Sequence, residues 1–349
     1  MSRNSVLFSA GLMALAFHSN RAPAAEAQGE AVKITQGKES VRVEINGELF
    51  TEYFFTGKSH PWVAPVKGPD AATGPAKTNW PMHVYFYPLL GPGGAAMTRD
   101  WPMKDVASEE HDHPHHRSLW YSHGAVNGID FWGEGTKSGK IVHDKFLEVK
   151  GGAESGVIRS TCKWIGPDNQ VVCTDERTFR VYARPNSERL FDFDITLKAL
   201  DKEVVFGDTK EGSMGIRVAE SMRLTHGKNK PGPGHIVQST GVRDDQTWGK
   251  PADWCDYYGP VNGKTVGIAM FDHPSNPRHP TTWHVRDYGL FAANPFGLHD
   301  FDKKPAGAGN MTIPPRQSVT FRYRFYLHEG DEKQAQVAER YKEYIAAAK

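Results

Sequence analysis

The densest group of chemically versatile side chains in the sequence is a run of histidines. Five of the sixteen lie at His111, His113, His115, His116 and His123. Neutral imidazole binds metal ions and exchanges protons near neutral pH, so this cluster suits either a metal site or acid–base catalysis. No standard zinc spacing such as His-Glu-x-x-His is present. Hydrogen bonding that shapes the loop is the simpler role for at least two of the five.

A second group of charged side chains lies among glycines between residues 209 and 220. Glycine allows close backbone approach, and Lys210 or Glu211 is suited to act on a substrate hydroxyl. If the segment is a strand, Glu211 and Arg217 share one face while Glu220 points the other way. The alternative is a set of exposed ion pairs along an edge strand.

A third segment, 271–297, mixes aromatic side chains with histidine, arginine and asparagine. Aromatic faces stack against the apolar face of a sugar ring, and the polar groups bind its hydroxyls, so the mixture favours a carbohydrate site. The alternative is that the tryptophans fill the core. Two tripeptides also recur, Asp-His-Pro at 112 and 272 and Val-Asn-Gly at 126 and 261. They indicate either two loops that meet in one cleft or chance.

Alternating apolar and polar residues predict half-buried antiparallel strands at 41–45, 49–53, 189–195 and 319–327. Asn46-Gly47 between the first two is a type I′ hairpin signature. Only 331–348 has helical spacing, through Val337, Tyr341, Tyr344 and Ile345, and we expect this helix to cap a sheet. The pattern predicts an all-β antiparallel sandwich with a short C-terminal helix, whose long polar loops at 56–80, 99–145, 206–260 and 272–312 carry the function.

The N-terminal residues 1–27 have the three parts of a secretory signal: Arg3, an apolar run over 6–17, and small residues before a cleavage point. An N-terminal membrane anchor is the alternative, although the run is short for a span. We therefore expect one domain over 28–349, in the periplasm or secreted, with no integral membrane segment after signal removal. The 42 basic and 41 acidic side chains nearly balance, which argues against nucleic acid as a partner.

The cysteines allow one disulfide. Cys162 and Cys173 flank the turn Gly166-Pro167-Asp168-Asn169, and pairing Ile165 with Gln170 places the two opposite each other on adjacent strands. An exported protein favours a bridge, and two buried thiols are the alternative. Cys255 is left over and has no feature of a nucleophile.

Six segments of the sequence together resemble those of a known family. They are Tyr87-Pro88-Leu89, Asp112-His113-Pro114-His115-His116-Arg117-Ser118-Leu119-Trp120, Val126-Asn127-Gly128-Ile129-Asp130-Phe131-Trp132, Lys210-Glu211-Gly212, Gly215-Ile216-Arg217 and Asn294-Pro295-Phe296-Gly297. Through them the chain resembles the exported bacterial proteins labelled "methane oxygenase PmoA", also described as a domain of unknown function. The resemblance implies a fold similar to the galactose mutarotase-like β-supersandwich of sugar epimerases. Methane oxidation is disfavoured because the membrane enzyme needs several apolar helices of about 20 residues.

The leading hypothesis is an exported carbohydrate-active enzyme, a hydrolase, lyase or epimerase of a sugar or oligosaccharide that uses acid–base catalysis. His116 and His123 transfer protons with Glu211 or Glu220, and Lys210 joins them in the catalytic set. The groups expected to bind substrate are Arg117, Asn127, Asp130, Trp132, Arg217, His273, Trp283, His284 and Asn294.

Two other functions stay open. In a metal-dependent enzyme, a divalent metal bound by His113 and His115, with His116 or His123, activates water or oxygen. In a non-catalytic sugar-binding protein, the tryptophans matter more than the histidines.

Overall fold

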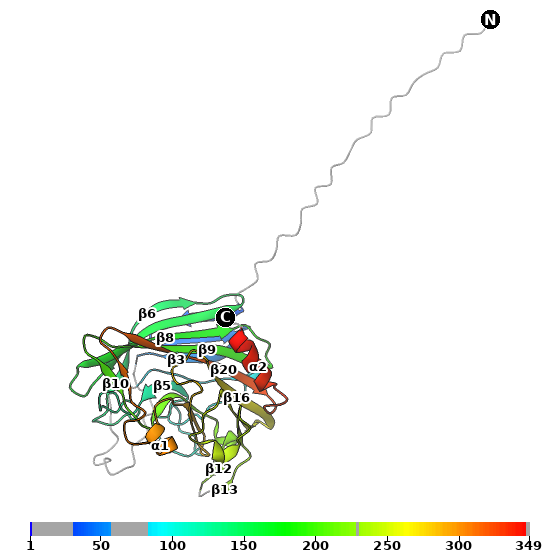
Figure 1. The fold of residues 1–349 in the computed structure, drawn as a ribbon. Coiled ribbons are helices and arrows are strands. Elements are labelled where there is room, and N and C mark those ends of the chain that lie inside the picture. Colours follow the sequence, from blue (N-terminus) through cyan, green and yellow to red (C-terminus); the bar gives the residue numbers. More distant parts are fainter. Residues whose placement is uncertain (2–30, 57–82, 228–229, 347–349) are drawn as a thin grey trace.

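The computed structural model describes residues 1, 31–56, 83–227 and 230–346, and its strands form two large antiparallel sheets (Figure 1). The first sheet has the order β1 (Val32–Gln36), β2 (Ser40–Ile45), β3 (Glu48–Phe54), β4 (Tyr85–Phe86), β5 (Leu119–His123), β11 (Gly212–Arg217), β18 (Leu290–Ala293) and β17 (Trp283–Val285). The second has the order β14 (His235–Gln238), β15 (Trp254–Val261), β16 (Lys264–Asp272), β20 (Ser318–Glu329), β9 (Glu188–Lys198), β8 (Val171–Tyr182), β7 (Ser155–Ile165) and β6 (Lys140–Lys150).

Smaller elements connect and flank these sheets. The minor strand pairs are β10 (Val204–Phe206) with β19 (Met311–Ile313) and β12 (Thr225–His226) with β13 (Lys230–Pro231). The helices are α1 (Leu298–Asp302), α2 (Val337–Ala346) and three 3-10 turns, η1 (Pro92–Gly94), η2 (Glu220–Met222) and η3 (Asp244–Thr247). Among the described residues, no helix has the length and apolar character needed to span a membrane. The predicted signal, apart from Met1, and most of the 56–80 loop lie outside the described residues.

The expected all-β antiparallel sandwich is confirmed, and so are the strands with clear alternation. The turn between β2 and β3 has positive φ at Asn46 (51°) and Gly47 (82°), as a type I′ hairpin requires. In β9 every second residue is buried in the main core, which lies between the two sheets. The period of two in the sequence therefore identifies the inner face of the second sheet.

A buried ion pair links the two sheets across this core. Arg177 on β8 donates two hydrogen bonds to Asp175 and one to the backbone carbonyl of Tyr121 on β5, at 3.3 Å for the latter. Trp164 donates to the same Asp175 carboxylate at 2.8 Å. Because every charged group there is hydrogen-bonded, the pair avoids the large cost of an unpaired buried charge.

The prediction of long functional loops over 99–145 and 206–260 is wrong where β5 and β11 cross the first sheet. All residues of both strands are buried, so neither strand shows the alternation of a half-buried strand. Strand β11 also contains two glycines, which weaken any strand signal. The two strands that position the candidate site are thus the ones that periodicity does not detect.

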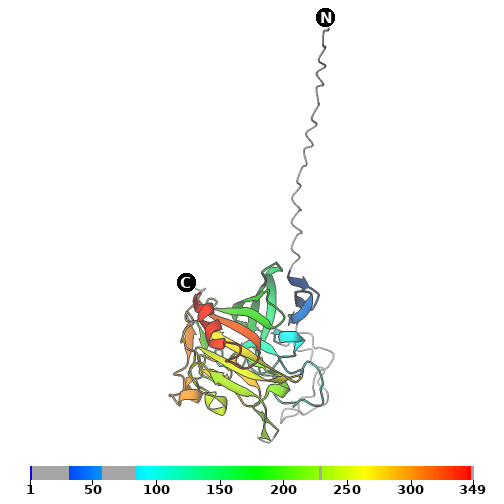
Figure 2. The ribbon, with the colours of Figure 1, turned by 90° about the vertical axis from the view of Figure 1, so that its right-hand side faces the viewer.

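The C-terminal helix is confirmed, although it is shorter than predicted. Residues 331–336 form turns that precede α2. The helix packs on β16 and β20 of the second sheet, where Tyr341 and Phe271 have ring centroids 5.7 Å apart (Figure 2). It therefore covers part of this sheet's outer face, as expected.

The predicted disulfide is wrong, and all three cysteines are buried free thiols. Ile165 pairs with Val171 rather than Gln170, and a bulge between Trp164 and Ile165 shifts the register by one more residue, so Cys162 pairs with Asp175 and Cys173 with Trp164. The two cysteines become diagonal neighbours, with Cα atoms roughly 7–8 Å apart, which exceeds the reach of a disulfide.

Candidate functional site

The candidate site lies on the outer face of the first sheet, which is turned away from the main core. One row across four strands pairs Trp120 with Gly215, Gly215 with Ala292, and Ala292 with His284. The inward neighbours of these residues, such as Phe291, belong to the main core, so the row faces outward. At about 4.8 Å per strand the row spans roughly 14 Å. A Cβ at Gly215 would lie 2.7 Å from the Trp120 ring, so glycine is required under this ring.

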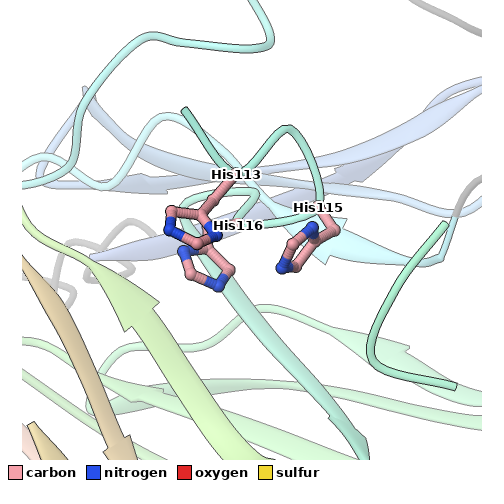
Figure 3. A group of neighbouring side chains, drawn as sticks. All are labelled: His113, His115 and His116. Carbon is pink, nitrogen blue, oxygen red and sulfur yellow. The ribbon is translucent and has the colours of Figure 1, made fainter. Parts of the chain in front are cut away.

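A single tight turn brings three histidines together just before β5. The His116 N–H donates to the His113 carbonyl at 3.0 Å, which closes a four-residue turn with Pro114 at the second position that proline favours. Figure 3 shows the His113 ring over the His116 ring, with His115 beside them. Each residue offers a ring nitrogen within 4.8 Å of the others.

Four aromatic rings form a near-parallel stack through this turn. Trp120 stacks on His116, His116 on His113, and His113 on Tyr288, with centroids 5.2, 4.6 and 5.2 Å apart and interplanar angles of 18°, 9° and 12°. Trp132 packs against the edge of His116 at 5.7 Å. The stack ties the histidine turn on one side to the β17–β18 hairpin on the other.

Two buried arginines, Arg99 and Arg217, hold the histidine turn in place through the Asp112 carboxylate. Asp112 accepts hydrogen bonds from both Arg217 and Arg99, whose side chains are fully buried. Burial opposes ionisation of Asp112, but Arg217 and Arg99 outweigh it and lower its pKa to about 2. The carboxylate is therefore ionised at neutral pH and neutralises one of the two arginine charges.

Arg217 also sets the protonation of His116. Its Nη1 lies 3.1 Å from Nδ1 of His116, and because guanidinium can only donate, Nδ1 is the acceptor. Burial and neighbouring positive charges hold the pKa of His116 well below its ordinary value, so the ring is neutral with its proton on Nε2. His116 is a hydrogen-bond donor through Nε2.

A second carboxylate of this region is Glu211, which directly precedes β11. Its side chain is 39% exposed and lies 3.7 Å from the Lys210 ammonium. Burial, Asp300 and Asp130 raise the pKa of Glu211 above its ordinary value, against the opposing effect of Lys210. A carboxyl group with a raised pKa is suited to exchange protons near neutral pH.

The buried amide of Asn294 holds this part of the chain in place. Its Nδ2 donates to the carbonyls of Thr209 and Lys210 at 3.0 and 2.8 Å, and its Oδ1 accepts from the Phe296 N–H at 2.9 Å. Both donor hydrogens and one acceptor position are thus committed to the backbone, and the side chain is fully buried. Asn294 therefore positions Lys210 and Glu211 rather than binding a sugar.

Contacts between elements place these groups along one outer face. Tyr288 stacks on His113, and Asn294, just after β18, holds the backbone of residues 209 and 210 just before β11. The histidine turn, the start of β11 and the β17–β18 hairpin therefore border the same part of the outer face, which we call the floor of the site. Burial, acting against Arg217 and Arg286, raises the pKa of Tyr288 to about 12, and burial, then Arg286, lowers the pKa of His284 to about 3.

Three residues that border this face were not among the individually predicted site residues: Trp248, Arg286 and Tyr288. Arg286 and Tyr288 lie in the predicted segment 271–297, whereas Trp248 lies outside it. The Arg286 guanidinium lies 5.4 Å from the Tyr288 ring centroid and 5.9 Å from that of Trp248. Trp248 donates its indole N–H to Nδ1 of His284 at 2.9 Å. The available signal for Trp248 was its place after the polar run 244–247, where a core residue is not expected.

Two predicted residues lie on the core side instead. His123 packs against Phe296 with ring centroids 4.6 Å apart, and its Nε2 lies 2.8 Å from the Gly207 carbonyl. Trp283 is fully buried in the main core and donates to the Ala252 carbonyl. Both alternate along their strands with outer-face residues, so neither can contact a ligand on that face.

Two predicted charged residues are committed to buried ion pairs. Arg117 lies near His115 but makes a bidentate pair with Glu134, at 3.0 and 2.7 Å. Glu220 lies in η2 and pairs with Arg223, whose side chain is 2% exposed. Neither group is free to act on a substrate.

Three further predicted residues shape loops. Asn127 has φ 49° in a type I′ turn with Gly128, the same geometry as Asn262-Gly263, so the recurring Val-Asn-Gly reflects turn chemistry. Asp130 accepts from the N–H groups of residues 132 and 133. His273 follows β16 of the second sheet and packs on Tyr344, so the two Asp-His-Pro motifs do not meet in one cleft.

The three-histidine group fits a metal ion only in part. Two nitrogens bound to zinc at 2.0–2.1 Å in a tetrahedral site lie roughly 3.4 Å apart, so the group would have to contract. His116 presents a further obstacle, because Nδ1 accepts from Arg217 and Nε2 carries the proton. A metal would therefore bind His113 and His115 first, close to two buried arginine charges.

The geometry defines an all-β protein of two antiparallel sheets with a histidine-, arginine- and carboxylate-bearing site on the outer face of one sheet. The sequence matches, over residues 40–342, a family of unknown function, DUF6807, and the chain belongs to that family. The comparison with curated proteins gives no match.

Solved structures to which the chain shows similarity include an aldose epimerase homologue and a galactose 1-epimerase. A GalM/aldose epimerase homologue from C. elegans is 7% identical, with a TM-score of 0.30, and galactose 1-epimerase from Lactobacillus acidophilus NCFM is 8% identical, with a TM-score of 0.32. Each alignment covers 86% of this chain and 100% of the other. Scores this low do not establish a shared site or a shared activity.

Proposed function

We propose that this chain is a carbohydrate-active enzyme, a hydrolase, lyase or epimerase that uses acid–base catalysis on the outer face of the first sheet. The observation that carries the proposal is the placement of Glu211, Tyr288 and the histidine turn along one outer face of the first sheet. Burial raises the pKa of Glu211 there. All three reaction types need a carboxylate or imidazole to move a proton at a sugar carbon or oxygen.

Each group around the floor has a distinct proposed role. Glu211 exchanges the proton, and Lys210 beside it stabilises developing negative charge. His116 donates from Nε2 to a substrate oxygen, held in that tautomer by Arg217. Tyr288, whose ring is occupied by His113 and the neighbouring arginines, offers its hydroxyl to the sugar.

We also propose that the protein acts outside the cytoplasm, on the basis of the sequence of residues 1–27 alone. Methane oxidation is not part of the proposal. Intact mass of the protein recovered from the native host tests the location. A mature N-terminus near residue 28 is expected, and an unprocessed chain would overturn this part of the proposal.

The test of the activity is a glycan library incubated with the purified protein and read by mass spectrometry. Glu211→Gln removes the titratable proton with almost no change in shape, so we expect turnover to fall at least about 100-fold. Glu148→Gln, a carboxylate of the same exposed fraction on β6, is the matched control and should keep full turnover. Full turnover by folded Glu211→Gln and His116→Ala proteins would overturn the proposal.

A metal-dependent enzyme is the second candidate, favoured by the three-histidine group alone. It predicts stoichiometric metal by elemental analysis, lost in a His113→Ala/His115→Ala double variant. A non-catalytic sugar-binding protein is distinguished by binding without product formation. Metal content below about one-tenth equivalent after purification without chelator, together with product formation, supports the acid–base proposal over both.

A further inference from the structure

Trp248 differs from every other tryptophan in the described part of the chain. Trp101, Trp120, Trp132, Trp164, Trp254 and Trp283 are all buried, whereas Trp248 is partly exposed. Next to it lies a cavity of about 300 Å³ lined by Asp245, Trp248, Val285, Arg286 and Asp287. This volume is at the lower end of the usual range for small-molecule sites, about 300–1,000 Å³, and suits one small ring.

The position of the Trp248 ring is fixed by a residue of the candidate site. Its indole N–H donates to Nδ1 of His284, and the two rings meet at 65°. Phe301 of α1 packs against the other side at 83°, and Gly249 has no room for a Cβ beside Phe301. A surface tryptophan held this firmly presents a pre-ordered face at low entropic cost.

Arg286 connects this cavity to the candidate site. Its guanidinium lies between the rings of Tyr288 and Trp248, 5.4 and 5.9 Å from their centroids. Tyr288 in turn stacks on His113. A ligand bound across Arg286 therefore extends along the β17–β18 edge of the sheet. One end lies beside the histidine turn and the other in the cavity beside Trp248.

We propose that the Trp248 cavity is a second sugar-binding subsite, so that the substrate is an oligosaccharide of at least two units. The inference rests on the proposed function and adds the substrate's minimum length. A partly exposed indole face stacks on the C–H face of a sugar, while Arg286 donates to its hydroxyls and Asp245 and Asp287 accept from them. The cavity holds one unit, and the unit that reacts lies beside Glu211.

The test measures how the response depends on saccharide length. Mono-, di- and trisaccharides of glucose, galactose, mannose, xylose and galacturonic acid are titrated against tryptophan fluorescence and assayed for turnover. For whichever sugar responds, we expect the disaccharide to bind about tenfold more tightly than the monosaccharide. Trp248→Ala should abolish that difference, and Trp248→Phe, which keeps an aromatic face, should keep most of it.

Leu200→Ala is the matched control, because Leu200 is a partly exposed apolar side chain that lines a cavity of about 410 Å³ elsewhere on the molecule. It should leave the length dependence unchanged. If mono- and disaccharides bind equally and Trp248→Ala matches the wild type, while Glu211→Gln is inactive, the subsite is refuted and the proposed function stands. If the wild-type protein neither binds nor converts any of these saccharides, the proposed function fails and the subsite fails with it.

Discussion

Replacing Asp112 by asparagine should destabilise the protein far more than a surface carboxylate would. The side chain accepts from both Arg99 and Arg217, and its amide replacement leaves two buried guanidinium groups without a counter-charge. The difference between the ordinary pKa of 3.8 and about 2 corresponds to about 2.5 kcal/mol of preference for the ionised form. Because the side chain is 31% exposed, solvent reduces this figure, and we expect a loss of about 2 kcal/mol at pH 7.

The pH dependence of the free energy of unfolding provides a second test of the same prediction. The folded-state pKa of Asp112 is lowered, so its contribution is complete above the unfolded-state value near 4 and is lost as pH falls toward 2. Wild-type stability should therefore fall by about 2 kcal/mol more than that of Asp112→Asn between pH 5 and pH 2. The variant should also lose turnover, because Arg217 no longer holds His116 in place.

Urea unfolding followed by near-ultraviolet circular dichroism at several pH values measures both effects. Asp201→Asn is the control, since Asp201 is 82% exposed and pairs with an equally exposed arginine. It should change the free energy of unfolding by less than about 0.5 kcal/mol. Equal effects of the two substitutions at pH 7, or parallel pH profiles for wild type and Asp112→Asn, would refute the reasoning about the arginine pair.

Three further predictions concern positioning, ionisation and covalent state. Asn294→Ala removes the hydrogen bonds that hold the backbone carbonyls just before Glu211, and it should cost about 1–3 kcal/mol of stability. Turnover should also fall at least about tenfold, measured by kinetics under conditions in which the variant is fully folded. His328 is buried against Asp256, and its pKa is raised. Its stabilising effect is therefore complete below the unfolded-state pKa near 6.5 and is lost as the pH rises through the folded-state pKa. The urea concentration at the unfolding midpoint should fall between pH 6 and pH 9 in the wild type, and less steeply in His328→Asn. Alkylation in denaturant without reductant should label three thiols. A single labelled thiol would instead indicate a disulfide between Cys162 and Cys173.

Strands with one buried face were predictable in both sheets. Periodicity of two marks β9 and β20 of the second sheet, and Asn46-Gly47 marks the β2–β3 turn of the first sheet through its need for positive φ. The centre of the first sheet was not predictable in this way. Strands β5 and β11 are covered on both faces, by the main core on one side and by the histidine stack on the other.

The sequence predicted the types of residue in the candidate site, but only some of the individual residues. Arg217 contacts the histidine turn, and Glu211 directly precedes the strand that carries Arg217. His123 and Trp283 fell on the wrong face because one residue of alternation separates the core from the outer face. That distinction needs the strand boundaries, which the sequence does not supply here.

The disulfide error has the same origin. A single bulge beside Trp164 changed the strand register, and the register decides which cysteine faces which residue. Trp248 was missed because its importance comes from contacts with distant residues, His284 and Phe301, that join it to the site.

The most direct test of the central claim is a crystal structure of the inactive Glu211→Gln protein soaked with the saccharide that the wild type converts best. The account predicts sugar density on the outer face of the first sheet, with the reacting unit between Glu211, His116 and Tyr288. Density confined to the second sheet, or to any surface that does not touch these three side chains, would contradict it.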